Sequence, residues 1–234
     1  MDIYKLLAII ACILLILLII VLNSRNRIVK TYNKYMKVDN KLNISGKQLA
    51  FFAKQNLGLD DLSFSLTKNK LGDAYNYKYK TLILSEDVCN TASLASLAIV
   101  SHELGHALQH KNNSPLFMIT ILMNKLTRLT SSFIIPLFVF GLFFYLFKYP
   151  TVDFGYMLMV ISGCLFTIQI LSKLLNIPLE YDASRRALKL LKENNLLSTS
   201  EYKKAKKLLG IAAQTYIASL FDELIITNKK RKKR

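Results

Sequence analysis

All three histidines of the chain lie in one short stretch, SHELGHALQH, which runs from Ser101 to His110. His102 and His106 flank Glu103 in the order His-Glu-x-x-His. With three histidines among 234 residues, chance would produce roughly 0.001 copies of this order. The spacing therefore indicates a functional site rather than an accident of composition.

The spacing suits a metal site that hydrolyses peptide bonds. On a helix, residues i and i+4 share a face, so His102 and His106 can direct both imidazoles at one zinc ion. Zinc lowers the pKa of a bound water towards about 7, and Glu103 could accept its proton and pass it to the leaving amine. The alternative is a pair of buried histidines beside a buried glutamate, which would need a cation partner that the helix does not offer. We predict one Zn²⁺ per chain.

His110 continues the histidine series at i+8. Two steps of four residues move it about 12 Å along a helix axis from His102, which is too far for one zinc ion to reach both. We expect His110 at the end of the helix or as a hydrogen-bond partner of the metal ligands.

The third ligand is predicted further along the chain, in a helix that Pro178 could begin. On a helical wheel, Glu180 is the only charged side chain on the apolar face. A lone carboxylate there needs a metal or a cation, and a buried salt bridge is the alternative. Asp182 falls on the charged face, where solvent would satisfy it. We therefore expect Glu180, and not Asp182, to be the ligand.

Three long uncharged runs predict membrane helices: Leu6–Leu22, Ser131–Phe147 and Phe154–Ser172. A bilayer core of about 30 Å needs roughly 20 apolar helical residues, with a usual range of about 17 to 25. The first run could be a cleaved signal peptide, but Asn23-Ser24-Arg25 offers no small-residue cleavage site. We interpret it as a retained anchor.

The distribution of the net charge of +17 predicts the orientation. Basic loops stay on the cytoplasmic side, and the segments before the second run and after the third are strongly basic. The N-terminus is then outside and the catalytic part is cytoplasmic. As a separate expectation, the host is bacterial. We expect an anchor at 3–22, a catalytic part at 23–115, a membrane hairpin at 116–175 with spans at 131–147 and 154–175, cytoplasmic helices at 176–227 and a basic tail at 228–234.

Periodicity adds a coarse secondary structure. We expect helix over 24–57, extended chain over Phe64–Leu84, and a helix from Thr91 to about His110. Leu116–Met123 is predicted as a short stretch at the membrane surface. The last helix, from about Ser200 to Thr227, could be a fourth span, but Asp222 and Glu223 argue for packing on the protein or the membrane surface.

Two segments could bind partners. Lys80–Ser85 has β character, so it could pair with an extended protein or peptide substrate or be an ordinary core strand. The tail KKRKKR suits anionic lipid better than nucleic acid, because no binding-module pattern accompanies it, and a solvated tail is the plain alternative. The three cysteines show no paired spacing and predict neither a disulfide framework nor a cysteine zinc site.

The combination of HELGHALQH, a membrane hairpin and PLEYDASRRAL resembles the YugP-type membrane zinc metallopeptidases, a gluzincin group. The segment LGDAYNYKYKTLILS before the zinc helix also fits, although Ala74 stands where the family often has histidine. The resemblance implies that His102, His106 and Glu180 bind zinc and that Glu103 is the base. Ser184 stands where more distant gluzincins carry aspartate, so it is the expected partner of a ligand.

We therefore expect a mainly α membrane protein with a minimal gluzincin-like α+β core, a short sheet and three transmembrane helices. Its predicted activity is zinc-dependent endopeptidase cleavage at the cytoplasmic membrane surface. The alternative is a non-catalytic zinc-binding membrane scaffold. Three protein ligands beside a base favour the enzyme, because structural zinc sites are usually closed by four ligands. Tyr75, Tyr77, Tyr79 and Tyr216 are candidates for stabilising the oxyanion or, alternatively, packing residues.

Overall fold

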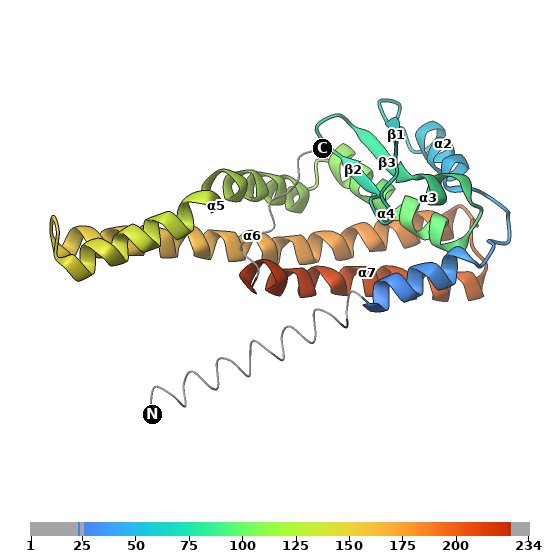
Figure 1. The fold of residues 1–234 in the computed structure, drawn as a ribbon. Helices are drawn as coiled ribbons and strands as arrows, with labels where there is room; N and C mark the ends of the chain where they lie inside the picture. The colour runs from blue at the N-terminus through green and yellow to red at the C-terminus, as the bar shows by residue number, and fades with distance from the viewer. Residues whose placement is uncertain (1–22, 24–25, 226–234) are drawn as a thin grey trace. The chain divides into compact units, whose positions relative to one another are not determined.

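The computed structural model describes residue 23 and residues 26–225. These residues form two compact units (Figure 1). The first unit holds the described residues up to Asn112 and those from Glu180 onward, and the second unit is Asn113–Leu179. The predicted anchor at 3–22 and the basic tail at 228–234 lie outside the described residues.

The described chain is mainly helical with one short sheet, as the sequence indicated. After a helix at 26–36, the elements follow in this order: α2 (Gly46–Asn56), β1 (Ser63–Thr67), β2 (Ala74–Asn76), β3 (Thr81–Ser85), α3 (Glu86–Asn90), α4 (Leu94–Lys111), α5 (Pro115–Phe147), α6 (Val152–Glu193) and α7 (Thr199–Ile225).

The helix expected over 24–57 is interrupted, because a new helix start is encoded inside it. The Ser45 hydroxyl accepts the backbone N–H of Gln48, and the Gln48 side chain accepts the backbone N–H of Ser45. This reciprocal capping box begins α2. The extended segment expected over Phe64–Leu84 is likewise divided into three strands by turns.

The three strands form a sheet in the order β1-β3-β2. β1 runs parallel to β3 with Ser63 opposite Thr81, and β2 runs antiparallel to β3 with Tyr75 opposite Leu82. β3 is therefore the central strand. Of the two alternatives for Lys80–Ser85, the ordinary core strand is confirmed, and the pairing of this segment with a substrate is excluded because both of its edges are occupied. The buried side chains of Leu82 and Leu84 explain its β character: the strand pairs on both sides and packs into the core.

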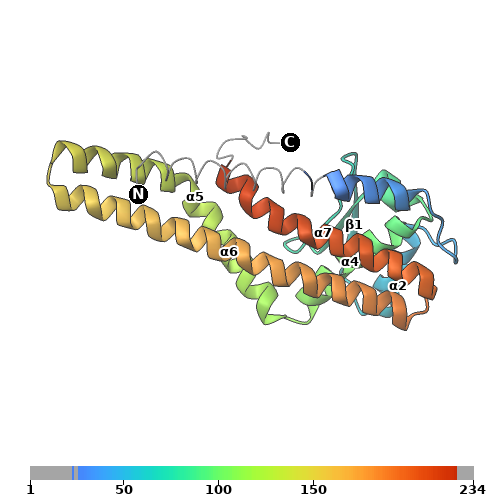
Figure 2. The ribbon, with the colours of Figure 1, turned by 90° about the horizontal axis from the view of Figure 1, so that it is seen from below.

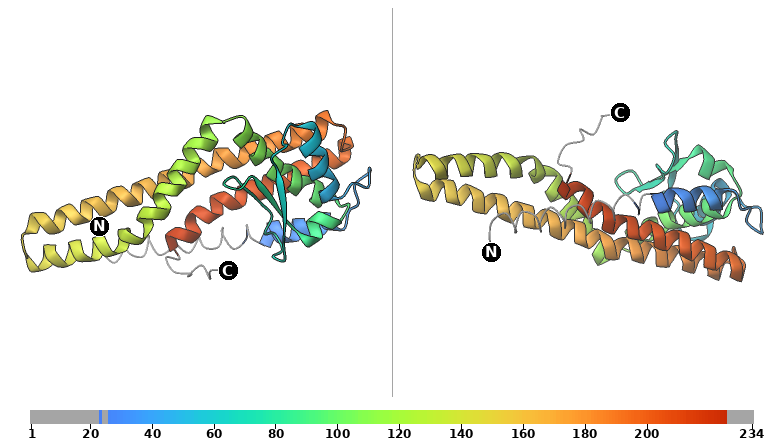
Figure 3. Two further views of the ribbon diagram at one scale, coloured as in Figure 1. Left: turned by 90° about the horizontal axis from the view of Figure 1, so that it is seen from above. Right: turned by 60° about the horizontal axis from the view of Figure 1, so that its bottom comes forward.

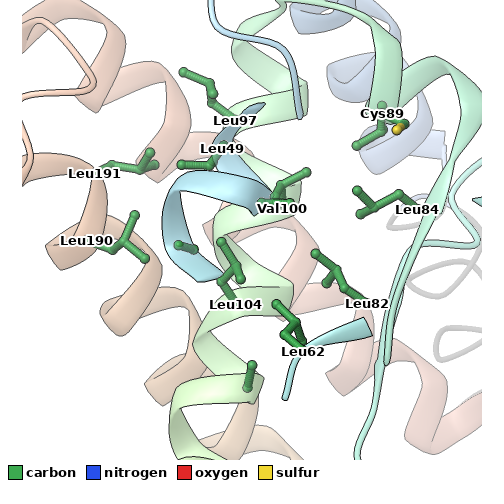
Figure 4. Close-up of a cluster of buried hydrophobic side chains, with 14 of the residues drawn as sticks. Leu49, Leu62, Leu82, Leu84, Cys89, Leu97, Val100, Leu104, Leu190 and Leu191 are labelled. Carbon is green, nitrogen blue, oxygen red and sulfur yellow. The ribbon is translucent and has the colours of Figure 1, made fainter. Parts of the chain in front are cut away.

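The core of the first unit lies around α4. Leu97, Val100 and Leu104 of this helix are fully buried, and they cluster with Leu82 of β3 and Leu191 of α6 (Figure 4). The helix begins at Ser93, whose hydroxyl accepts the backbone N–H of Ser96. This packing fixes both the position and the rotation of the helix that carries the histidines.

In the first unit, the end of α6 runs side by side with α7 (Figures 2 and 3). Ala187 of α6 packs in one buried cluster with Ala205, Leu208 and Leu209 of α7. The prediction that Pro178 begins a helix is wrong, since Pro178 lies inside α6. Proline removes one helical hydrogen bond, but its fixed φ suits a helix, so a long helix held by packing can continue through it.

The second unit is a hairpin of α5 and the first part of α6 (Figure 3). The helices approach closely at Gly141 and Gly155, where a Cβ on Gly155 would lie 2.4 Å from the backbone nitrogen of Tyr145. The Ser162 hydroxyl also donates to the backbone oxygen of Ile134 at 2.7 Å. The short stretch predicted over Leu116–Met123 is not separate, because α5 continues through it into the apolar run.

Within the described residues, α5 and α6 are long and apolar enough to cross a membrane. Only 6% of the most apolar stretch of α5 and 11% of that of α6 is buried. This exposure differs from that of a core helix in a soluble protein, which is mostly covered by other elements. The two predicted spans at 131–147 and 154–175 lie in these helices.

Candidate metal centre

Three side chains of the first unit converge on one point. His102 and His106 lie on the same face of α4, with ring centroids 4.9 Å apart and ring planes at 87°. Glu180 of α6 faces them, and its Oε2 lies 3.0 Å from His102 Nε2 and 3.5 Å from His106 Nε2. Only 12%, 13% and 7% of these three side chains is exposed, respectively.

The two helices can approach because small residues line the contact. A Cβ on Gly105 would lie 2.4 Å from the backbone oxygen of Ala183, so only glycine fits at this point of α4. Ala183 and Ala187 of α6 are fully buried. The glycine inside the motif therefore brings the carboxylate of Glu180 within reach of both imidazoles.

The geometry and the donor types fit zinc. One ligand atom from each of His102, His106 and Glu180 lies within 4.8 Å of the others, so one ion could contact all three. Two imidazole nitrogens and a carboxylate oxygen are donors that catalytic zinc sites use. Burial alone would lower the pKa of His106, but the hydrogen bond and charge of Glu180 raise it to about 9. Positive charge is thus favoured beside Glu180.

Glu103 is positioned differently from Glu180. Its Oε2 accepts the backbone N–H of Tyr75 at 2.9 Å, which holds the carboxylate against strand β2. Burial raises the pKa of Glu103, while the nearby imidazoles of His102 and His106 oppose this shift. A carboxylate with a raised pKa beside a metal site can accept and release a proton.

The second ring nitrogen of each histidine also has a partner. His102 Nδ1 lies 3.2 Å from the hydroxyl of Ser184, the residue expected to support a ligand. His106 Nδ1 lies 2.9 Å from Oε1 of Gln109, whose Nε2 donates to Asp182 Oδ2 at 2.9 Å. Such partners fix the orientation of a metal-binding imidazole.

The prediction that Asp182 faces solvent is wrong. Only 12% of its side chain is exposed, because Gln109 of α4 reaches it and two arginines cover it. Arg186 donates to Oδ2 at 2.7 Å, and Arg185 donates to Oδ1. Sequence reasoning missed Gln109, and it missed the hydrogen bond that links Gln109 to Asp182. The available signal was the position of Gln109, which lies three residues after His106 and so on the same face of the helix.

His110 lies in the last turn of α4 and is not among the three side chains that could hold a metal. Its Nδ1 lies 2.9 Å from the Tyr75 hydroxyl, and the rings of Tyr75 and Tyr77 pack against it. Burial and the charge of Lys80 lower the pKa of His110. Tyr75 therefore links the end of the zinc helix to β2, while Tyr79 is 65% exposed.

Comparison with known proteins identifies the family. The family described as "Putative neutral zinc metallopeptidase" matches residues 9–227. The chain belongs to this family. It is also 27% identical over 203 residues to the "Putative membrane protease YugP" of Bacillus subtilis (strain 168), covering 85% of this chain and 86% of that protein. No solved structure matches the chain. Together, this relative and the two apolar helices assign the chain to a membrane.

Proposed function

We propose that the chain is a membrane-embedded zinc endopeptidase whose active site lies at the cytoplasmic surface of a bacterial membrane. The observation that carries the proposal is the convergence of His102, His106 and Glu180 within 4.8 Å. Family membership supports the reaction class, and the Bacillus relative supports the membrane. One Zn²⁺ per chain fits this donor set.

The proposed chemistry assigns a separate task to each carboxylate. His102, His106 and Glu180 would hold the zinc ion, which would supply Lewis acidity and lower the pKa of a bound water towards about 7. Glu103 would accept a proton from the attacking water and deliver it to the leaving amine. The Tyr75 N–H holds one oxygen of Glu103, which leaves the other oxygen for the proton. Ser184 and Gln109 orient the two imidazoles.

The substrate is proposed to be a protein or peptide, because the chain belongs to a family described as metallopeptidases. The basic segments flanking the hairpin favour a cytoplasmic site, and the Bacillus relative favours a bacterial host. A scaffold that only holds zinc would have no use for a proton-accepting carboxylate beside three ligands. The catalytic reading is therefore preferred.

The proposal is tested on the full chain purified in detergent. Metal analysis should find one zinc per chain, and a library of unmodified peptides should be cleaved in a manner that a chelator abolishes and added zinc restores. Zinc without cleavage of any peptide or unfolded protein would support the scaffold. Cleavage that persists after complete removal of metal would reject the zinc mechanism.

A further inference from the structure

One buried amide lies between the metal centre and a charged cluster. Gln109 is fully buried, with Oε1 2.9 Å from His106 Nδ1 and Nε2 2.9 Å from Asp182 Oδ2. An ionised carboxylate can only accept hydrogen bonds, so the amide must turn its NH₂ group towards Asp182. This leaves the amide oxygen, which can also only accept, for His106.

The orientation of the amide determines the tautomer of His106. Because Oε1 accepts, the proton of a neutral His106 must sit on Nδ1, and Nε2 keeps its lone pair. Nε2 is the atom that faces Glu180 at 3.5 Å. In a neutral His106, the ring nitrogen that would bind a metal is therefore the one that carries no proton.

Two arginines hold the other end of this chain of contacts. Arg186 donates to Oδ2 of Asp182, the same oxygen that accepts from Gln109, and 30% of its side chain is exposed. Arg185 donates to Oδ1 and is 80% exposed. Both keep Asp182 ionised, but Arg186 is the arginine that shares an oxygen with the buried amide.

His102 has no equivalent constraint from its own partner. Its Nδ1 lies 3.2 Å from the hydroxyl of Ser184, and a hydroxyl can rotate to donate or to accept. Ser184 is therefore compatible with either tautomer of His102, whereas Gln109 is compatible only with the tautomer of His106 that is protonated on Nδ1.

We propose that Arg186, Asp182 and Gln109 form a polar relay that holds His106 in the tautomer required for metal binding. The inference rests on the proposed zinc site and adds three positioning residues to it. The relay lets Asp182 act on a histidine that it does not touch. It also gives a reason for a fully buried glutamine on the zinc helix.

The relay predicts how much each substitution weakens zinc binding. Zinc affinity is measured by competition with a chromogenic chelator, using the full chain in detergent. Gln109→Met keeps the size of the side chain but removes both hydrogen bonds, and should weaken zinc binding about 10- to 100-fold. Asp182→Ala should weaken it by a similar factor. Arg186→Gln should weaken it less, and Arg185→Gln should weaken it least, because Arg185 contacts the Asp182 oxygen that Gln109 does not touch. Gln55→Met, at an exposed position of α2, is the control for the chemical change.

A double-mutant cycle distinguishes the relay from independent effects on packing. If Asp182 acts through Gln109, Asp182→Ala should cost no further zinc affinity in a Gln109→Met background. Thermal unfolding with chelator present shows whether the zinc-free fold survives each change. Wild-type affinity in Gln109→Met, or a full additional loss in the double variant, would overturn the relay. If Gln109→Met does not fold, the zinc affinities of Arg186→Gln and Arg185→Gln are compared instead. Equal zinc affinities of these two variants would overturn the relay. A wild-type chain that binds no zinc would instead reject the metal centre itself.

Discussion

A carboxylate beside two imidazoles can be a ligand, a base or a counter-ion, and the direction of its oxygens distinguishes these roles. Oε2 of Glu180 lies within 3.5 Å of Nε2 of both histidines, where a ligand of the same metal would lie. Oε2 of Glu103 accepts the N–H of Tyr75. The two carboxylates therefore have separate positions, and we propose that Glu180 binds the metal and that Glu103 transfers the proton.

The first prediction concerns Glu180. Glu180→Ala should lower zinc content and peptidase activity together, because it removes one of three ligands. Glu193→Ala, on the same helix but with a side chain that is 61% exposed, is the control and should retain both. Metal analysis after dialysis, together with an activity assay, provides the measurement. Full zinc occupancy in Glu180→Ala would remove Glu180 from the ligand set.

At the residue scale, spacing and a helical wheel were enough to select the three side chains that the structure brings together. Both methods use the angle of a residue about its own helix. The same methods placed Asp182 wrongly. The angle of Asp182 about its own helix does not show that a long side chain on another helix can reach it. Gln109 bridges that gap and buries a carboxylate that the wheel assigned to solvent.

At the scale of the elements, the metal centre depends on how closely α4 and the end of α6 approach. Gly105 is the contact point, with the backbone oxygen of Ala183 only 2.4 Å from where a Cβ would be. That oxygen belongs to the backbone, so it cannot move aside as a flexible side chain would. Any side chain at position 105 must therefore push the helices apart.

The second prediction concerns Gly105→Ala. The added methyl group should separate the histidines from Glu180, weaken zinc binding and destabilise the fold by about 1–3 kcal/mol, as overpacking does. Gly210→Ala in α7, where no atom lies within 4 Å of the added Cβ, is the control and should be neutral or stabilising by about 0.5–1 kcal/mol. Denaturant unfolding and zinc titration measure both effects. Unchanged zinc affinity in Gly105→Ala would contradict the role of the close approach.

The position of an element could be predicted from the sequence where one local signal dominated. It was less predictable where packing between distant segments determined the structure. Apolar periodicity located α4, and its start at Ser93 is a side-chain cap. Pro178 was expected to begin a helix, but α6 continues through it because packing outweighs the loss of one hydrogen bond. The strand order, which makes β3 central, depends on contacts between distant segments and has no local signal.

At the scale of the whole molecule, the chain must place Glu180 on the same side of the membrane as the histidines. Between α4 and Glu180 lie α5 and the apolar part of α6, the two helices that could cross a membrane. Two crossings return the chain to the side from which it started. The topology predicted from charge is therefore compatible with a metal site built from both segments.

The third prediction concerns orientation. A single cysteine at Thr151, in the link between α5 and α6, should react with an impermeant thiol reagent added to intact cells, because this link is predicted to lie outside. A single cysteine at Ser200 should react only after the membrane is opened. Both are made in a chain in which Cys12, Cys89 and Cys164 are replaced. The opposite pattern of labelling would place the metal centre outside the cell.

The measurement that tests the central claim most directly is peptide cleavage by Glu103→Gln, performed with metal analysis of the same sample. The amide keeps the size of the side chain and can still accept the N–H of Tyr75, but it cannot take a proton from water. Zinc content should remain at one per chain, while cleavage of accepted peptides should fall at least about 100-fold. Cleavage at the wild-type rate by zinc-loaded Glu103→Gln would contradict the assignment of Glu103 as the base and, with it, the proposed mechanism.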